Sequence, residues 1–217
     1  MKVGTDGVLL GAWASVACLQ QQNVLDIGTG TGLIALMIAQ RNPHAMIEGI
    51  DIDNASIEQA QENVAASPFR AQIAIDKRDF RNMDGFSNNY HLIVSNPPFY
   101  QEDTLGGNTS RDAARHTVSL PFETLISNAR KLLHEEGLFG VITPHQSAAD
   151  FISICAQNQL YLQRRTDVQS TPRKPFNRTL LEFGTHLRPT ATSTLTLYDT
   201  NNQRTAAYTQ LTKDFYL

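Results

Sequence analysis

The stretch Val24-Leu25-Asp26-Ile27-Gly28-Thr29-Gly30-Thr31-Gly32 decides the fold of this chain. An apolar run leads into a turn with three alternate glycines, and the apolar segment 33–39 that follows has the composition of a buried helix. In such a strand, turn and helix unit, glycines let the backbone approach a ligand closely, and the helix amides point toward that ligand. The sequence therefore predicts an α/β fold with a ligand site at this turn.

The chemistry of the turn favours a cationic ligand over a pyrophosphate. The third glycine is Gly32 and Leu33 follows it, so the spacing differs from the dinucleotide-binding fingerprint. Asp26, just before the turn, would repel a phosphate but suits a positive charge. The pattern resembles the S-adenosylmethionine turn of Rossmann-like methyltransferases, whose ligand carries an ammonium and a sulfonium. The resemblance implies that S-adenosyl-L-methionine contacts Asp26, Gly28, Gly30 and Gly32.

A second motif, Asn96-Pro97-Pro98-Phe99, follows the apolar run 92–94 and is expected at the carboxyl end of a buried strand. The Asn96 side-chain oxygen and the Pro97 carbonyl could accept both hydrogens of an amino group on a heteroaromatic ring. Such acceptors favour the pyramidal, cationic nitrogen of a methyl-transfer transition state. Phe99 would stack on an extruded base, a contact worth ~1–3 kcal/mol, and Tyr100 would support it.

We therefore assign catalysis to Asn96, Pro97 and Phe99, and count Asn96 in the cofactor site as well. The alternative is that the two prolines merely end a strand and begin a loop, because proline forces extended geometry on its predecessor and lacks an N–H donor.

Further acids follow two other expected strands. Asp51 ends the expected second strand, 19 residues after Gly32, where an acid commonly holds ribose hydroxyls. Its competitor Asp53 precedes Asn54 and could instead cap the next helix. Asp79 could accept a hydrogen bond from the adenine of the cofactor, with Phe80 beside the ring. The alternative for Asp51 and Asp79 is a solvated loop carboxylate or a helix cap.

Composition indicates one domain over residues 1–217, because 217 residues with 41% hydrophobic content suffice for one sizeable core. The chain has neither an apolar stretch of membrane-spanning length nor the apolar core of a signal peptide, so we expect a cytoplasmic protein, most simply a monomer. The two cysteines, Cys18 and Cys155, form no CxxC motif and are expected to be reduced core thiols. The six histidines show no metal-ligand spacing, so we predict no metal.

Charge is distributed unevenly along the chain. A net charge of −3 argues against a broad nonspecific binder of nucleic acid. Between Arg164 and Arg178, however, five basic residues face Asp167 alone, and Phe176 lies among them. This pattern predicts a patch that binds RNA, although an ordinary solvated loop and strand pair would look the same. The expected RNA contacts are Tyr100, Arg111, Arg115, Arg164, Arg165, Arg173, Lys174 and Arg178.

Strand and helix signals alternate along the chain. Strands are expected near 23–27, 46–51, 71–75, 90–95, 137–143, 160–168 and 178–186, and helices near 31–41, 54–66, 120–134 and 145–157. This alternation predicts a mostly parallel, seven-stranded sheet with helices on both faces. A Thr-rich strand is also expected at 195–198. The polar stretch that follows the Asn-Pro-Pro-Phe motif is interpreted as a mobile substrate loop.

Over essentially all 217 residues the chain resembles the bacterial tRNA1(Val) adenine-37 N6-methyltransferase family. Six segments carry the resemblance: 2–13, 26–32, 96–100, 111–116, 178–183 and 214–217. It implies a Rossmann-like class I methyltransferase that methylates N6 of adenine 37 in the anticodon loop, with the base turned out of its stack. It also makes Thr5 and Asp6 candidate contacts to the methionine end of the cofactor. Such proteins normally carry residues before this element, which leaves open a shortened N-terminus.

Other readings share the Asn-Pro-Pro-aromatic motif. It also occurs in methyltransferases that act on guanine N2 of ribosomal RNA, on adenine in DNA and on glutamine side chains. A guanine-N2 methyltransferase acting on ribosomal RNA is the first alternative, and a cofactor-binding RNA module without transfer activity is the second. Asn96 and Phe99 argue against the second. A nicotinamide dehydrogenase is disfavoured by the position of Gly32 and by Asp26.

Overall fold

A computed structural model describes residues 4–16, 22–82, 86, 89–97 and 120–215. The strands of the described residues are β1 (Gln22–Ile27), β2 (Ala45–Asp51), β3 (Ile73–Lys77), β4 (Tyr90–Ser95), β5 (Leu133–Pro144), β6 (Tyr161–Gln169), β7 (Arg178–Gly184) and β8 (Ala191–Thr196). The helices are α1 (Thr5–Trp13), α2 (Leu33–Arg41), α3 (Asn54–Ala65), α5 (Phe122–Leu132), α6 (Ala148–Gln157) and α7 (Ala206–Thr212), with a 3₁₀ turn η1 (His145–Ser147) before α6.

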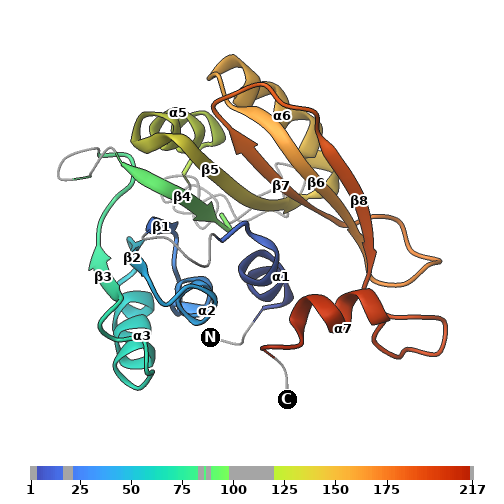
Figure 1. The fold of residues 1–217 in the computed structure, drawn as a ribbon, viewed down its shortest axis with the longest axis horizontal. Coiled ribbons are helices and arrows are strands. Elements are labelled where there is room, and N and C mark those ends of the chain that lie inside the picture. Colours follow the sequence, from blue (N-terminus) through green and yellow to red (C-terminus); the bar gives the residue numbers. More distant parts are fainter. Residues whose placement is uncertain (1–3, 17–21, 83–85, 87–88, 98–119, 216–217) are drawn as a thin grey trace, which may run out of the picture.

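The strands form one sheet in the order β3-β2-β1-β4-β5-β7-β6-β8 (Figure 1). Strands β1 to β5 pair in parallel, while β7 is antiparallel to both β5 and β6. The chain first moves outward from β1 to β3 and then crosses back to β4 on the other side of β1. Ligands of open α/β sheets bind at the carboxyl ends of the strands where the order reverses in this way. We call the end of the sheet at which β1, β2, β4 and β5 finish the carboxyl edge, and the opposite end the amino edge.

The prediction of a mostly parallel sheet with helices on both faces is confirmed, but the prediction of seven strands is wrong. The eighth strand, β8, pairs in parallel with β6 and begins at Ala191, earlier than the Thr-rich strand expected at 195–198. Its first four residues are exposed and small or polar, so no apolar alternation marks them. An edge strand needs only one partner and little burial, and for that reason composition signals it poorly.

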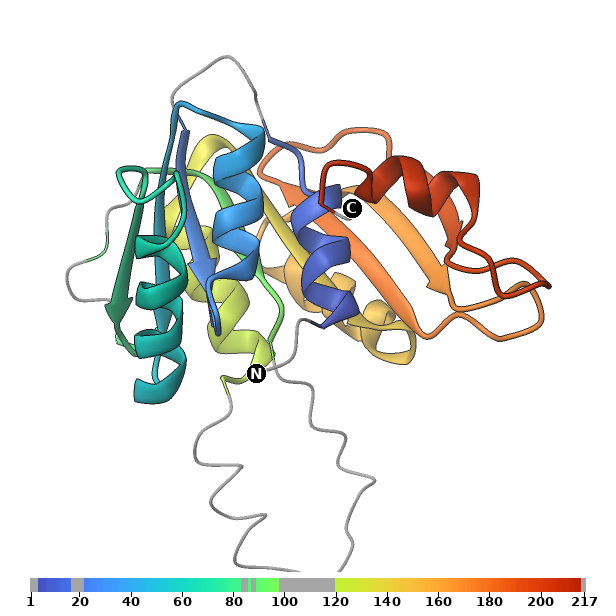
Figure 2. The ribbon, with the colours of Figure 1, turned by 90° about the horizontal axis from the view of Figure 1, so that it is seen from below.

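Helices cover both faces of the sheet. Figure 2 shows α3, α2, α1 and α7 side by side over one face, while α5 and α6 lie over the other (Figure 1). The longest described helix, α3, has 12 residues, and none of the described helices is both long enough and apolar enough to cross a membrane.

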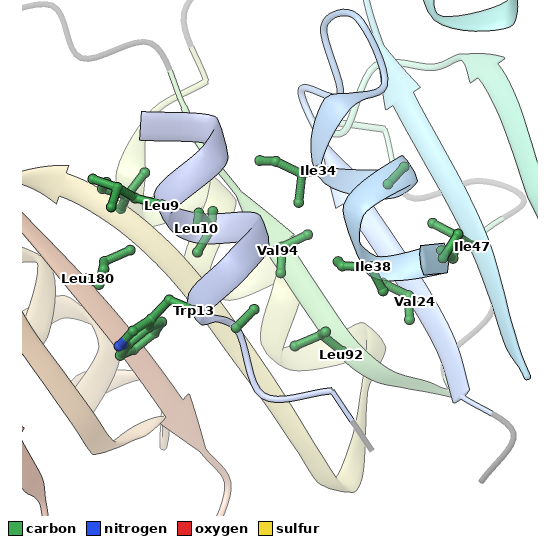
Figure 3. Close-up of a cluster of buried hydrophobic side chains, with 14 of the residues drawn as sticks. Leu9, Leu10, Trp13, Val24, Ile34, Ile38, Ile47, Leu92, Val94 and Leu180 are labelled. Atoms are coloured by element: carbon green, nitrogen blue, oxygen red, sulfur yellow. The ribbon is translucent and has the colours of Figure 1, made fainter. Parts of the chain in front are cut away.

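Helix α1 lies at the centre of the first core. Its side chains Leu9, Leu10 and Trp13 point toward the sheet beside Ile34 and Ile38 of α2 (Figure 3). Buried residues from strands across the sheet pack against them, among them Val24, Ile47, Leu92, Val94 and Leu180. Every residue from 7 to 13 is buried, because α1 packs against the sheet below and between α2 and α7. This core therefore holds the first turn of α1 at a fixed place beside the sheet.

The second core lies under α5 and α6. Phe139 and Phe183 on the sheet pack against Phe151 of α6, with ring centroids 6.2 and 6.0 Å from that of Phe151. Cys155 is fully buried in the same cluster, and burial raises the pKa of its thiol, which therefore stays protonated. The expectation of a reduced core thiol is confirmed for Cys155, whereas Cys18 lies outside the described residues. The two cores together fix the strand ends that carry the candidate site.

Candidate active site

The glycine turn joins β1 to α2 at the carboxyl edge. Gly28, Gly30 and Gly32 have φ values of 69°, 57° and 77°, in the left-handed region that side chains strongly disfavour. The amides of Gly28 and Thr29 both donate to the carbonyl of Ile50 at 2.9 Å, which ties the turn to β2. A Cβ on Gly28 would meet no atom within 4 Å, so this position faces open space. The turn thus exposes backbone where a ligand can approach, as the sequence predicts.

Asp26 is completely buried beneath this turn. Its Oδ2 accepts hydrogen bonds from Thr29 Oγ1 at 2.7 Å and from the Ala35 amide at 3.2 Å. Its Oδ1 is buried and has no hydrogen-bond partner among the described residues. Burial raises the pKa of Asp26 to about 6, against the effect of the bond from Thr29. A buried carboxylate with an unsatisfied oxygen gains from a cation, so the residue fits a ligand that carries an ammonium or a sulfonium.

Asp51 connects the turn to the end of β2. Its Oδ2 accepts from the Gly30 amide at 3.0 Å, and its Oδ1 accepts from the Asp53 amide at 3.0 Å. Asp53 itself caps α3, accepting from the Ser56 amide at 2.8 Å, and this hydrogen bond lowers the pKa of Asp53. The prediction that Asp53 caps this helix is therefore confirmed. Asp51 is left beside the glycine turn, and its ribose contact stays a prediction.

A cavity of about 210 Å³ opens beside Asp51. It brings together Asp51, Asp79 and Phe80, which the sequence predicts around the ribose and adenine of the cofactor, with Gly28 of the glycine turn. The residues that line the cavity are Ile27, Gly28, Ile50, Asp51, Ile52, Arg78, Asp79, Phe80, Arg81 and Leu120. Mostly apolar walls with two carboxylates suit a flat base attached to a hydroxylated sugar.

The remaining lining residues of this cavity were not assigned to the site from the sequence, and Ile52 and Leu120 illustrate why. Ile52 could have been found as the apolar residue that directly follows the strand-end acid Asp51. Leu120 lies far along the chain, just before α5, and no local sequence pattern connects it with the site.

Asp79 is held at the rim of the cavity by Arg81, whose Nη2 lies 2.7 Å from Asp79 Oδ2, and the hydrogen bonds from Arg81 lower the pKa of Asp79.

Asn96 and Pro97 follow β4 directly, at the point where the strand order reverses. In the register of β1 and β4, Ser95 pairs with Ile27, and Ser95 Oγ donates to the Ile27 carbonyl at 3.0 Å. Asn96 therefore lies next to Gly28. Pro97 is buried, and Asn96 is partly exposed. The structure thus places the Asn-Pro step beside the glycine turn.

The other half of the second motif cannot be placed in the same way. Phe99, Tyr100, Arg111 and Arg115 lie outside the described residues, so their predicted roles stay predictions.

The first turn of α1 reaches the same edge. Thr5 is exposed there, and Asp6 Oδ2 accepts from Arg178 Nε at 2.8 Å. This ion pair joins a residue predicted to contact the cofactor with one predicted to contact RNA. Both roles stay predictions, and the ion pair shows that the two regions are adjacent.

The basic residues between 164 and 178 are not a single patch. Arg164 pairs with the buried Glu182 at 3.3 Å, and its guanidinium lies 3.6 Å from the Trp13 ring centroid, toward the amino edge. Arg165 pairs with Asp167 at 3.0 Å. Of the five, only Arg173 and Lys174 are exposed, in the loop between β6 and β7 at the carboxyl edge. All five stay predicted RNA contacts, and this loop offers the two most accessible charges.

The described residues contain no group of three or more His, Cys, Asp or Glu side chains that could hold a metal ion. The site consists of a mostly apolar cavity with two carboxylates, a buried acid and an amide side chain at a strand end.

Comparison with known proteins agrees with this arrangement. The family model of the methyltransferase small domain matches residues 7–164. Over 219 aligned positions the chain is 41% identical to the tRNA1(Val) (adenine(37)-N6)-methyltransferase of Pectobacterium carotovorum subsp. carotovorum, covering 100% of this chain and 88% of that protein.

Solved structures agree in fold. A structure described as a predicted O-methyltransferase from Agrobacterium tumefaciens superimposes with a TM-score of 0.76, at 19% identity, over 96% of each chain. A geranyl diphosphate methyltransferase solved in complex with SAM superimposes with a TM-score of 0.57, at 11% identity, over 76% of this chain and 79% of that one. At such identities the likeness concerns the fold alone.

Proposed function

Because this chain belongs to the tRNA1(Val) (adenine(37)-N6)-methyltransferase family, we propose that it methylates N6 of adenine 37 in the anticodon loop of tRNA1(Val), using S-adenosyl-L-methionine. The main support for the proposal is that the glycine turn and the Asn-Pro step lie side by side, at the neighbouring ends of β1 and β4. We expect the enzyme to act as a monomer in the cytoplasm.

The residues at the turn suit each part of the cofactor. When bound, S-adenosyl-L-methionine supplies a methyl group that its sulfonium makes electrophilic. The cavity beside Asp51 would hold the nucleoside, with Asp79 and Phe80 at the base. Asp26, ionised beneath the turn, would favour the positive charges of the ligand.

Asn96 and Pro97 would act on the acceptor base. The Asn96 side-chain oxygen and the Pro97 carbonyl accept the two hydrogens of the amino group, which orients the nitrogen and stabilises the positive charge that develops on it. Because Pro97 is buried and follows β4 without a break, these acceptors are fixed before the base arrives. No strong base is required, since the methylated, cationic nitrogen is acidic and loses its proton to water.

Nucleoside analysis tests the proposal directly. The purified protein would be incubated with radiolabelled S-adenosyl-L-methionine and tRNA that lacks the modification, and the digested product separated by mass spectrometry. We expect N6-methyladenosine at position 37 of tRNA1(Val). A matched reaction with ribosomal RNA provides the contrast, because N2-methylguanosine there would establish the alternative enzyme. Cofactor binding without any methylated nucleoside would indicate the RNA-binding module instead.

A further inference from the structure

A chain of polar side chains crosses β6 and β7 at the carboxyl edge. Thr179 on β7 pairs in register with Asp167 on β6, and its Oγ1 donates to Asp167 Oδ1 at 2.8 Å. Arg165 Nε donates to the same carboxylate at 3.0 Å. Thr179 is fully buried and the Asp167 side chain is only 18% exposed. The chain of hydrogen bonds is therefore well shielded from water and rigid.

These hydrogen bonds determine the tautomer of His145, which follows the end of β5. His145 Nδ1 lies 2.9 Å from Thr179 Oγ1 and 3.3 Å from Asp167 Oδ1. Since Thr179 gives its only proton to Asp167, its oxygen must accept from His145, and Nδ1 therefore carries the imidazole proton. In the neutral ring Nε2 is then left with a lone pair. Nε2 has no hydrogen-bond partner among the described residues, and the side chain is 34% exposed.

Phe176 lies against this histidine. The two ring centroids are 5.4 Å apart at an interplanar angle of 44°. The amide of Asn177 donates to the Val168 carbonyl at 2.9 Å, and the His145 amide donates to the Asn177 carbonyl at 3.2 Å. These bonds hold the backbone next to Phe176, so the partly exposed ring has a fixed place. The exposed Arg173 and Lys174 are in the same loop.

The pair lies on the reaction side of the molecule. In the register of β4 and β5, Ser95 pairs with Val141, so Asn96 is level with Ile142. His145 comes three residues later, directly after β5 ends at Pro144, so it lies at most roughly 10 Å further along the strand direction. A nucleotide next to a base held at Asn96 can reach that position.

We propose that His145 and Phe176 bind an unpaired nucleotide that neighbours the target adenine in the RNA. The proposal rests on the proposed function and extends it to the recognition of the flanking sequence. The base stacks on Phe176, and a donor of the nucleotide, either a base amino group or the ribose 2′-hydroxyl, bonds to His145 Nε2. Arg173 and Lys174 contact the adjoining phosphates.

Matched variants separate recognition from structure. His145→Asn keeps an N–H near the position of Nδ1, which can still donate to Thr179, but removes the Nε2 acceptor. Phe176→Leu removes the flat face, and Phe176→Tyr keeps it. His186→Asn is the control, because that exposed histidine pairs with Glu136 at the amino edge. Thermal unfolding and calorimetry with S-adenosylhomocysteine are expected to give wild-type values for all four proteins.

The measurement is the affinity for an anticodon stem-loop that carries 2-aminopurine on one side or the other of adenine 37. We expect His145→Asn and Phe176→Leu each to weaken binding about tenfold, with Phe176→Tyr and the control close to wild type. The fluorescence of 2-aminopurine at one flanking position should be quenched by the wild type and not by Phe176→Leu. An abasic site at that position should abolish the difference between the wild type and Phe176→Leu. A 2′-deoxy sugar there should abolish the effect of His145→Asn only if the donor is the 2′-hydroxyl.

The outcomes separate this inference from the proposed function. Equal stem-loop affinity of the wild type, His145→Asn and Phe176→Leu would overturn the nucleotide site, even if all three methylate adenine 37. If binding depends on both residues but no N6-methyladenosine forms, the site stands and the proposed function falls. Failure of the wild type to bind the stem-loop would overturn the nucleotide site, whereas the proposed function would still be decided by N6-methyladenosine in tRNA1(Val).

Discussion

Asp26 is an acidic residue that the fold removes completely from water. One oxygen of its carboxyl group has no partner within the part of the chain that the structure describes, and burial raises its pKa to about 6. Ionisation of Asp26 is therefore less favourable in the protein alone than in water, and it becomes more favourable beside a bound cation. Two pH effects follow from this single group.

The first effect concerns stability. Between pH 4 and 6 the folded protein keeps a proton that the unfolded chain releases, so this group's contribution to the free energy of unfolding falls as pH rises through that window. The shift corresponds to about 3 kcal/mol. In urea unfolding from pH 4 to 7, Asp26→Asn should lack this component, and its stability relative to wild type should rise by up to that amount. A difference that is constant over this range would show that Asp26 does not titrate in this way.

The second effect concerns the ligand. A cationic ligand favours ionised Asp26, so the affinity for S-adenosylhomocysteine, which keeps the ammonium, should rise about tenfold between pH 5 and 7. Calorimetry near pH 6 in buffers of different ionisation enthalpy should detect proton release on binding. Asp26→Asn should bind more weakly, with little dependence on pH. Proton uptake by the wild type would contradict the assignment.

For Asn96 we predict an effect on turnover. Asn96→Ala should lower kcat by about 10²-fold or more, because an acceptor for the developing cationic amine is lost. The affinity for S-adenosylhomocysteine should change little, which calorimetry would check. If the variant methylates as fast as the wild type in a single turnover, the Asn-Pro step has no catalytic role and only ends the strand.

At the scale of elements, α1 is attached to the far strands of the sheet through Glu182. This β7 carboxylate accepts from the Ser15 amide at 2.9 Å and from Ser15 Oγ at 2.8 Å, just after α1 ends. It also pairs with Arg164, whose guanidinium covers Trp13. The Trp13 indole N–H donates to Thr166 Oγ1 at 2.9 Å. Through these contacts with Trp13 and Glu182, Arg164 helps to hold α1 to the sheet.

Removing the carboxylate tests this attachment. Glu182→Ala should lower the free energy of unfolding by about 3–5 kcal/mol, because it leaves the charge of Arg164 without its buried partner. Replacing both residues by apolar ones, Arg164→Met with Glu182→Leu, should restore much of the loss. Urea unfolding of the single and double variants gives the comparison. A Glu182→Ala protein as stable as the wild type would mean that α1 is held by its apolar contacts alone.

At the scale of the whole molecule, the fold gathers distant segments at one edge of the sheet. The start of α1, the ends of β1, β2 and β4, and the loop between β6 and β7 all lie at the carboxyl edge. A cofactor and a macromolecular substrate can therefore meet there.

The loop between β6 and β7 makes the RNA contact testable. Removing Arg173 and Lys174 together should flatten the slope of log affinity against log salt by roughly one to two units, because phosphate contacts are lost. Binding of S-adenosylhomocysteine should not change. Arg70 and Lys131, which are exposed at the amino edge, form the matched control pair. An unaltered salt slope for the Arg173 and Lys174 variant would remove this loop from the interface.

The sequence by itself determined the features that depend on local geometry. The positive φ values of the glycine turn, the cap at Asp53 and the strand before Asn96 each follow from residues within one strand, turn or helix. Near neighbours decide these features, and so a short window of sequence contains the signal.

Only the tertiary structure decided the features that join distant residues. Arg178 meets Asp6 across 172 positions, Arg164 is drawn to Trp13 and Glu182, and β8 joins the sheet as an eighth strand. The tautomer of His145 likewise depends on a side chain 34 residues away. Such contacts depend on the register of nonadjacent strands and on which face each side chain occupies, and a shift of one residue would reverse that face. No local pattern encodes that register, because it is set by the packing of the whole sheet against its helices.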